Sequence, residues 1–138
     1  MKMIVVYSCI GIIVVIISLL VVRQFKHTSK GNDADLFVIN ELKKAGSDLS
    51  KPHDVEFHFI SAGKENLESM IKEFKSVDYK ITQIFADENE KNKKEYFVDV
   101  VKTMIVSEET IIPESALMSR LADKYKVTFD GWGASIVK

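Results

Sequence analysis

The sequence predicts an α+β protein, a ferredoxin-like βαββαβ domain with an extra N-terminal helix, preceded by a single transmembrane helix. The first observation behind this prediction is a run of twenty uncharged residues near the N-terminus, residues 3–22. The second is the order of the patterns after it, where segments that alternate with period two are interleaved with segments of helical period. Two helices separated by a strand hairpin are typical of the split βαβ unit, in which both helices cover one face of an antiparallel sheet.

The apolar run has the length of a membrane span. At about 1.5 Å per residue, a helix over residues 3–22 crosses the ~30 Å hydrocarbon core of a bilayer. The run is longer than the apolar region of a cleaved signal peptide, and Arg23 and Lys26 follow it in place of a small-residue cleavage site. The sequence therefore predicts an uncleaved anchor over residues 1–23, in contact with the lipid bilayer.

The charges beside this run predict its orientation. One lysine precedes the run, and three basic residues follow it before residue 31. Because basic flanks favour the cytoplasmic side, we expect a single-pass protein of the inner (cytoplasmic) membrane whose C-terminal domain lies in the cytoplasm. Residues 24–33 are polar and are interpreted as a juxtamembrane linker, and residues 34–138 as the folded domain.

The composition of the domain excludes several functions. Residues 31–138 hold all 20 acidic residues and 15 of the 19 basic ones, which gives a net charge of −5. A nucleic-acid-binding domain carries a basic footprint, so no direct contact with nucleic acid is expected. The only cysteine, Cys9, lies in the apolar run. Disulfides, thiolate metal sites and cysteine nucleophiles are therefore excluded from the domain.

The first element after the linker is the extra helix. Apolar residues recur at helical spacing from Leu36 to Leu42, and Gly46 follows them as a stop signal. Asp33 or Asp35 can cap the start of this helix.

The remaining patterns give the βαββαβ order. Strands are expected over residues 51–60, 79–86, 96–106 and 127–137, and helices over residues 64–77 and 110–126. The third strand carries bulky residues on both faces, which predicts a central place in the sheet. Polar residues between the second and third strands form the tip of their hairpin, and one sheet face remains open to water or to a partner.

No catalytic set assembles from these residues. In a strand, Glu56 and His58 share one face, and His53 falls on the other face or in the preceding loop, so a metal site lacks a third ligand. Neither a serine-nucleophile motif nor a glycine-rich phosphate loop occurs in the sequence. The chain is predicted not to be an enzyme and to need no metal or cofactor, and His58 is placed on the open sheet face.

The stretch FDGWG in the last strand is the most distinctive motif. Gly131 or Gly133 can supply the backbone conformation of a β-bulge, with Trp132 packed over the sheet. The same bulge can turn the tryptophan outward as a contact residue, since tryptophan is enriched at protein–protein hot spots. Both interpretations stay open. The predicted partner-binding residues are Asp130, Gly131, Trp132, Gly133 and His58.

Two stretches carry a resemblance to a known family. One is a helix that ends in ADKYKV and leads into a V-x-F-D-G-W-G strand, and the other is the Gly46-Ser47-Asp48 turn upstream. Both resemble the bacterial ribonuclease E inhibitor family, the regulators of ribonuclease activity B. The resemblance covers residues 35–137 in element order. It implies a ferredoxin-like domain that catalyses no reaction and binds ribonuclease E outside its catalytic part.

The predicted function is therefore that of a membrane-anchored regulator that binds a ribonuclease E-like enzyme or an RNA-decay complex. The anchor would take the place of the family's acidic tail by raising the effective concentration at the membrane. The alternative is a membrane-tethered domain that senses a small ligand, since ferredoxin-like sheets also bind small molecules.

Overall fold

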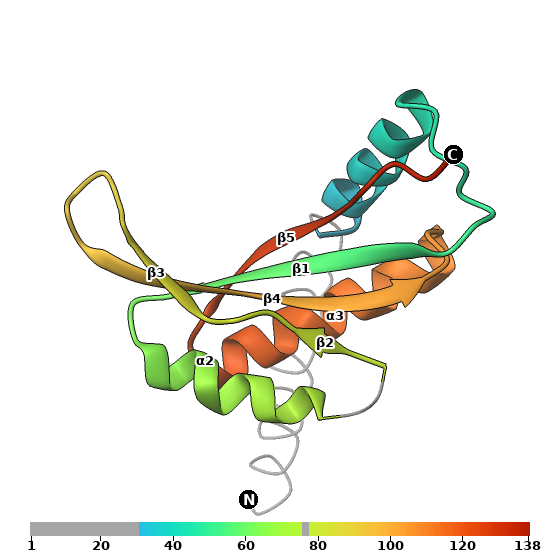
Figure 1. Cartoon of the computed structure of the whole chain (residues 1–138). Coiled ribbons are helices and arrows are strands. Elements are labelled where there is room, and N and C mark those ends of the chain that lie inside the picture. The colour runs from blue at the N-terminus through green and yellow to red at the C-terminus, as the bar shows by residue number, and fades with distance from the viewer. Residues whose placement is uncertain (1–30, 76–77) are drawn as a thin grey trace, which may run out of the picture. The chain divides into compact units, whose positions relative to one another are not determined.

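The computed structural model describes residues 31–75 and 78–138, within which Ala34–Lys138 forms one compact unit (Figure 1). The unit is α+β, with a five-stranded antiparallel sheet and three α-helices. The N-terminal helix covers residues 31–44 of the described chain. The elements after it are β1 (His53–Ser61), α2 (Lys64–Met70), the 3-10 helix η1 (Ile71–Phe74), β2 (Lys80–Ile81), β3 (Phe85–Glu88), β4 (Lys94–Met104), α3 (Glu108–Tyr125) and β5 (Thr128–Ala134).

The two longest strands form the middle of the sheet. The strand order is β2-β4-β1-β5, and β3 pairs with the other end of β4. Phe57 of β1 lies opposite Val100 of β4 and opposite Trp132 of β5. The predicted central position of the strand over residues 96–106 is thus confirmed, because β4 has neighbours on both sides.

Alternation along β1 separates two faces of the sheet. We call the covered side the core face, where α2 and α3 pack (Figure 1), and the other side the open face. Odd-numbered residues of β1 are buried from His53 to Ser61, while the even-numbered ones are exposed or half-buried. The core includes Val55, Phe57, Phe59, Leu67, Met70, Val98, Val100, Ile111 and Met118.

The N-terminal helix belongs to the same core. Ile39 and Leu42 are buried, as the helical spacing predicts. The helix ends at residue 44, and Gly46 follows with a φ of 82°, a left-handed conformation that favours glycine. Asp35 lies inside this helix and not at its N-cap, because residues 31–34 are already helical.

The predicted second strand, residues 79–86, is wrong in one respect, because it forms two strands. Between β2 and β3 the side-chain oxygen of Thr82 accepts a hydrogen bond from the Asp99 backbone N–H, at 2.9 Å. This hydroxyl replaces a strand carbonyl, so the regular ladder is interrupted. The sheet therefore has five strands and not the four of the predicted βαββαβ order.

The predicted transmembrane part of the fold class is also corrected. Within residues 31–75 and 78–138, no helix has both the length and the apolar character needed to cross a bilayer. The segment expected to do so, residues 3–22, lies outside the described residues. The predicted location in the inner membrane, which depended on that helix, is withdrawn with it.

Candidate functional site

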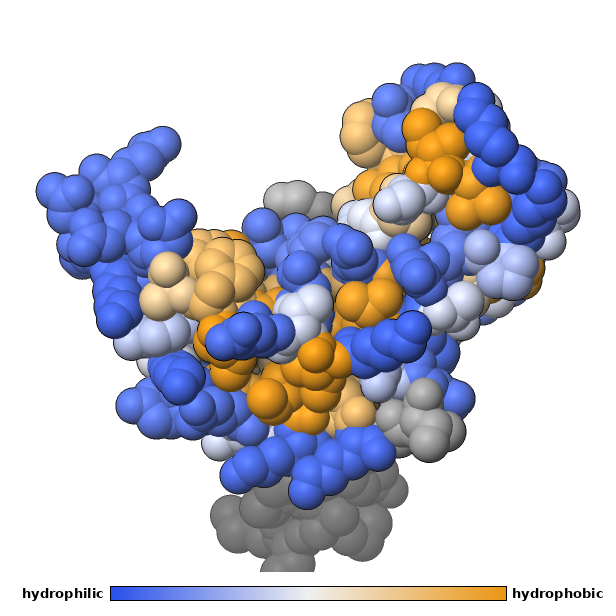
Figure 2. Space-filling model, viewed as in Figure 1, coloured by the Kyte–Doolittle hydropathy of each residue, from blue (hydrophilic) through white to orange (hydrophobic). Residues whose placement is uncertain are grey.

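The open face combines acidic and aromatic side chains. The strand register places five carboxylates on it, those of Asp54, Glu56, Asp87, Glu95 and Asp99. Four apolar residues share this face: Ile60, Phe85, Phe97 and Val101. Figure 2 shows apolar surface lying between hydrophilic side chains over the strands.

The aromatic residues of the open face form a stacked pair, in which Phe85 is exposed and Phe97 is half-buried. Phe85 of β3 stacks on Phe97 of β4, with ring centroids 5.1 Å apart and an interplanar angle of 13°. Phe85 remains 55% exposed although it is a large apolar side chain. An aromatic pair of this kind is a common anchor for a protein partner.

His58 lies at the middle of the open face, as predicted. Its Nδ1 is 2.7 Å from Oδ1 of Asp99, which stands directly opposite it in the β1–β4 register. Both side chains are partly exposed. The sequence did not predict Asp99 at this site, because strand pairing, and not spacing along the chain, makes Asp99 and His58 neighbours.

A β-bulge in β5 confirms the interpretation of the glycine motif. Phe57 pairs with Trp132 and Phe59 with Phe129, so Asp130 and Gly131 together oppose a single residue of β1. Gly131 has a φ of 97°, a conformation that is strained for residues with a side chain. Gly133 lies on the open face, where an added Cβ would stand 3.8 Å from His58 Nε2.

Trp132 points into the core and not onto the open face. Its side chain is 7% exposed, and its Nε1 donates a hydrogen bond of 2.9 Å to Oδ1 of Asp35. The structure therefore gives the indole a packing role. Its predicted contact with a partner stays a prediction, as does that of the exposed Asp130.

Sequence reasoning considered Asp35 only as a helix cap and missed its buried role beside Trp132. It is 5% exposed, and burial raises the pKa of its carboxyl, while hydrogen bonds from Trp132 and Ser115 act in the opposite direction. The sequence did contain a signal, because Asp35, Ile39 and Leu42 follow the four- and three-residue steps of one helix face.

The raised pKa of Asp35 predicts a pH effect on stability. The folded state binds the proton more tightly than the unfolded chain, whose pKa is near 3.8. The stability that this proton contributes is fully present below that pH and is lost as the pH rises through the folded pKa. Asp35→Asn keeps an oxygen for Trp132 without a charge, so we expect its free energy of unfolding to rise relative to wild type as the pH increases from 4 to 7.

Urea unfolding of both proteins across this pH range measures the difference directly. Other carboxylates contribute equally to both proteins and cancel in the comparison. A difference that stays constant with pH would show that Asp35 titrates normally in the folded protein.

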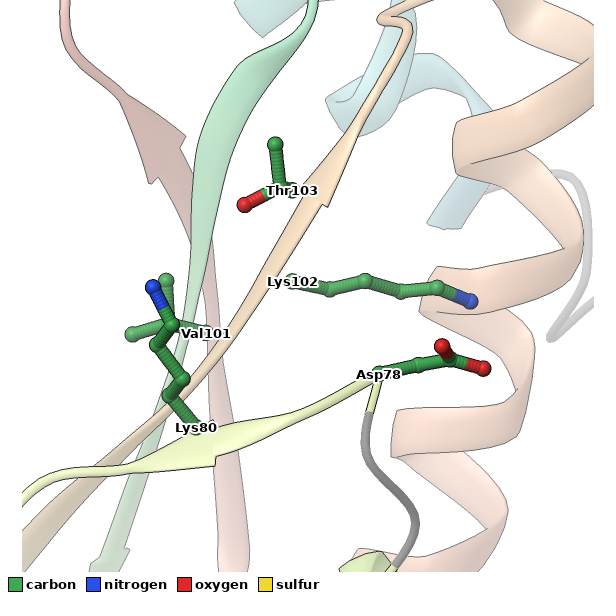
Figure 3. Close-up of a pocket in the computed structure, with 5 residues that line it drawn as sticks. All are labelled: Asp78, Lys80, Val101, Lys102 and Thr103. Carbon is green, nitrogen blue, oxygen red and sulfur yellow. The ribbon is translucent and has the colours of Figure 1, made fainter.

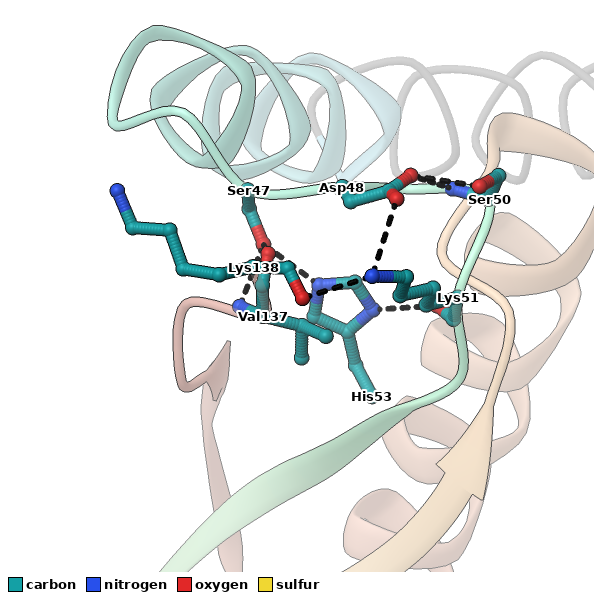
Figure 4. A network of polar contacts seen from close by, with 7 residues as sticks. All are labelled: Ser47, Asp48, Ser50, Lys51, His53, Val137 and Lys138. Atoms are coloured by element: carbon teal, nitrogen blue, oxygen red, sulfur yellow. Dashed lines mark hydrogen bonds and ion pairs between the residues drawn. The ribbon is translucent and has the colours of Figure 1, made fainter.

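The Gly46-Ser47-Asp48 turn has a structural role (Figure 4). The Ser47 hydroxyl oxygen is 2.7 Å from Nε2 of the buried His53 and accepts a hydrogen bond of 3.0 Å from the Val137 N–H. The other ring nitrogen of His53 is 2.8 Å from the Lys51 carbonyl oxygen. The turn thus joins the N-terminal helix, the start of β1 and the C-terminus.

A shallow depression of about 260 Å³ lies at the β2–β4 edge, lined by Asp78, Lys80, Val101, Lys102 and Thr103 (Figure 3). Ligand pockets are typically about 300–1,000 Å³, and most of their lining is apolar. Lys102 is already paired with Glu114 of α3 at 3.2 Å. This depression gives no support to the ligand-sensing alternative.

Comparison with known proteins gives one consistent result. The sequence model of the family described as Regulator of ribonuclease activity B matches residues 32–134. A protein of Salmonella typhi with this name is 29% identical over 96 residues, which are 70% of each chain. A protein of the same name from Aeromonas hydrophila is 26% identical over 96 residues, which are 70% of this chain and 84% of that protein. Another from Proteus mirabilis is 27% identical over 108 residues, which are 78% of this chain and 76% of that protein. This chain belongs to the regulator of ribonuclease activity B family.

Proposed function

We propose that this chain is a non-catalytic regulator that binds a ribonuclease of the ribonuclease E type through the open face of its sheet. Family membership supports the kind of partner, because the relatives are named as regulators of ribonuclease activity. Residues 34–138 act as the binding domain.

The observation that carries this proposal is the aromatic pair within an acidic surface. Phe85 and Phe97 stack on the open face, opposite the side on which α2 and α3 pack. Exposed aromatic rings supply a large contact area at a low cost in side-chain entropy. Glu95 and Asp99 flank Phe97 along β4, and Asp87 lies two residues after Phe85 along β3. These carboxylates favour a partner with basic side chains.

Phe85→Ala is expected to weaken binding to the ribonuclease by about tenfold or more, the range of an aromatic hot spot. The side chain is 55% exposed and belongs to a strand at the sheet margin, so its removal leaves the core intact. Biolayer interferometry of the full-length chain against purified ribonuclease E from the same bacterium measures the change. A parallel RNA-cleavage assay reports whether binding alters the rate.

Phe37→Ala is the matched control, because Phe37 is 64% exposed and lies on the N-terminal helix, outside the sheet. We expect it to bind as wild type does. Loss of binding in Phe37→Ala with none in Phe85→Ala would move the contact surface to that helix. No binding of the wild-type chain to the ribonuclease would refute the proposed function itself.

A further inference from the structure

Three potential metal ligands converge on the open face. Glu56, His58 and Asp99 each offer one donor atom, and these atoms lie within 4.8 Å of one another. Glu56 and His58 are two residues apart on β1, and strands place such residues on the same face. Asp99 joins them from β4, where it stands directly opposite His58.

Two of the three donors already lie close to ligand spacing. Nδ1 of His58 and Oδ1 of Asp99 are 2.7 Å apart, and two ligands that bind one ion at about 2.0–2.2 Å are typically about 3–3.5 Å apart. A metal ion would therefore take the place of the proton that these two atoms share, with only a small separation of the side chains. Glu56 is exposed, and its carboxylate oxygen lies within 4.8 Å of the other two donor atoms.

The surroundings of the three side chains favour a cation. Two carboxylates offset the charge of a divalent ion, and the imidazole supplies a nitrogen lone pair. On the β5 side, Gly133 stands opposite Glu56 and carries no side chain, so the remaining coordination positions stay open to solvent.

We propose that Glu56, His58 and Asp99 form a site for a divalent transition-metal ion of the zinc type. Imidazole and carboxylate are ligands that Zn²⁺ accepts, and an open site of three protein ligands leaves a position for water or for a donor from a partner. Spacing along one strand brings only Glu56 and His58 to this face; the third ligand, Asp99, comes from a strand 41 residues further along the chain.

Calorimetric titration of the full-length chain with ZnCl₂ tests the site without any ribonuclease, so its outcome is separate from that of the proposed function. We expect one ion per chain. His58→Ala and Glu56→Gln should each weaken the affinity by at least about tenfold, whereas the matched control Asp54→Asn, on the same strand and face, should bind nearly as wild type.

The imidazole ¹⁵N resonances provide a second measurement. Zn²⁺ should shift the signal of His58. The signal of His53 should stay unchanged, because its two ring nitrogens already contact Ser47 and Lys51. Saturable binding lost in His58→Ala and Glu56→Gln, with the shift confined to His58, supports the site. The site is overturned if wild type shows no saturable binding, or if Glu56→Gln binds Zn²⁺ as wild type does. The Glu56 side chain is exposed, so this substitution leaves the chain folded.

Discussion

Trp132→Ala is expected to lower the free energy of unfolding by about 3–5 kcal/mol, the usual cost of removing a large aromatic side chain from a core. Trp132 is 7% exposed and stands opposite Phe57 in the sheet. The truncation also removes the N–H that donates to Asp35. The buried carboxyl would then lose a partner, which adds to the cost of the cavity.

Trp132→Phe separates these two contributions. A phenyl ring retains most of the packing and lacks the N–H donor, so we expect a smaller loss of about 1–3 kcal/mol, from the unpaired Asp35 oxygen and the lost ring volume. Urea unfolding followed by circular dichroism measures both variants. A Trp132→Ala protein as stable as wild type would contradict the packing role and favour the predicted contact with a partner.

His53→Ala is expected to lower the free energy of unfolding by about 3 kcal/mol, from a buried cavity and two lost hydrogen bonds. His53 is 1% exposed; its Nδ1–H donates to the Lys51 carbonyl oxygen, and its Nε2 contacts the Ser47 hydroxyl. Ser47 in turn accepts from the Val137 N–H. Loss of the imidazole therefore loosens the attachment of the C-terminal segment as well as the start of β1.

His58→Ala is the natural comparison, since it removes the same side chain from the same strand on the open face. The His58–Asp99 pair is partly exposed, and such pairs contribute only about 0–1 kcal/mol. Unfolding experiments on the two variants should differ by about 2 kcal/mol or more. Equal losses would show that the two faces of β1 contribute alike to stability.

The bulge in β5 explains why the sequence left the direction of Trp132 open. In a regular strand, side chains three residues apart point to opposite faces. Phe129 and Trp132 are three apart, yet both stand opposite core-face residues of β1, because Asp130 and Gly131 occupy a single register position between them. The FDGWG motif predicted a bulge, but which residue took the extra position depended on pairing with β1.

The sequence by itself determined the helices and strands whose residue pattern repeats every few positions. The periods of β1, β4 and α3 and the stop at Gly46 were readable, because each is set by residues a few positions apart. The family resemblance was readable from two short motifs and is confirmed over residues 32–134. The open-face position of His58 followed from simple alternation.

Tertiary structure alone decided how distant segments meet. The Trp132–Asp35 hydrogen bond joins residues 97 positions apart, and the His58–Asp99 pair joins residues 41 apart. Between β2 and β3, the Thr82 hydroxyl bonds to β4 and the register with β4 shifts by one residue. The hydrophobic pattern of a segment specifies which face it buries, but the partner across that face is chosen by the register and packing of the whole sheet.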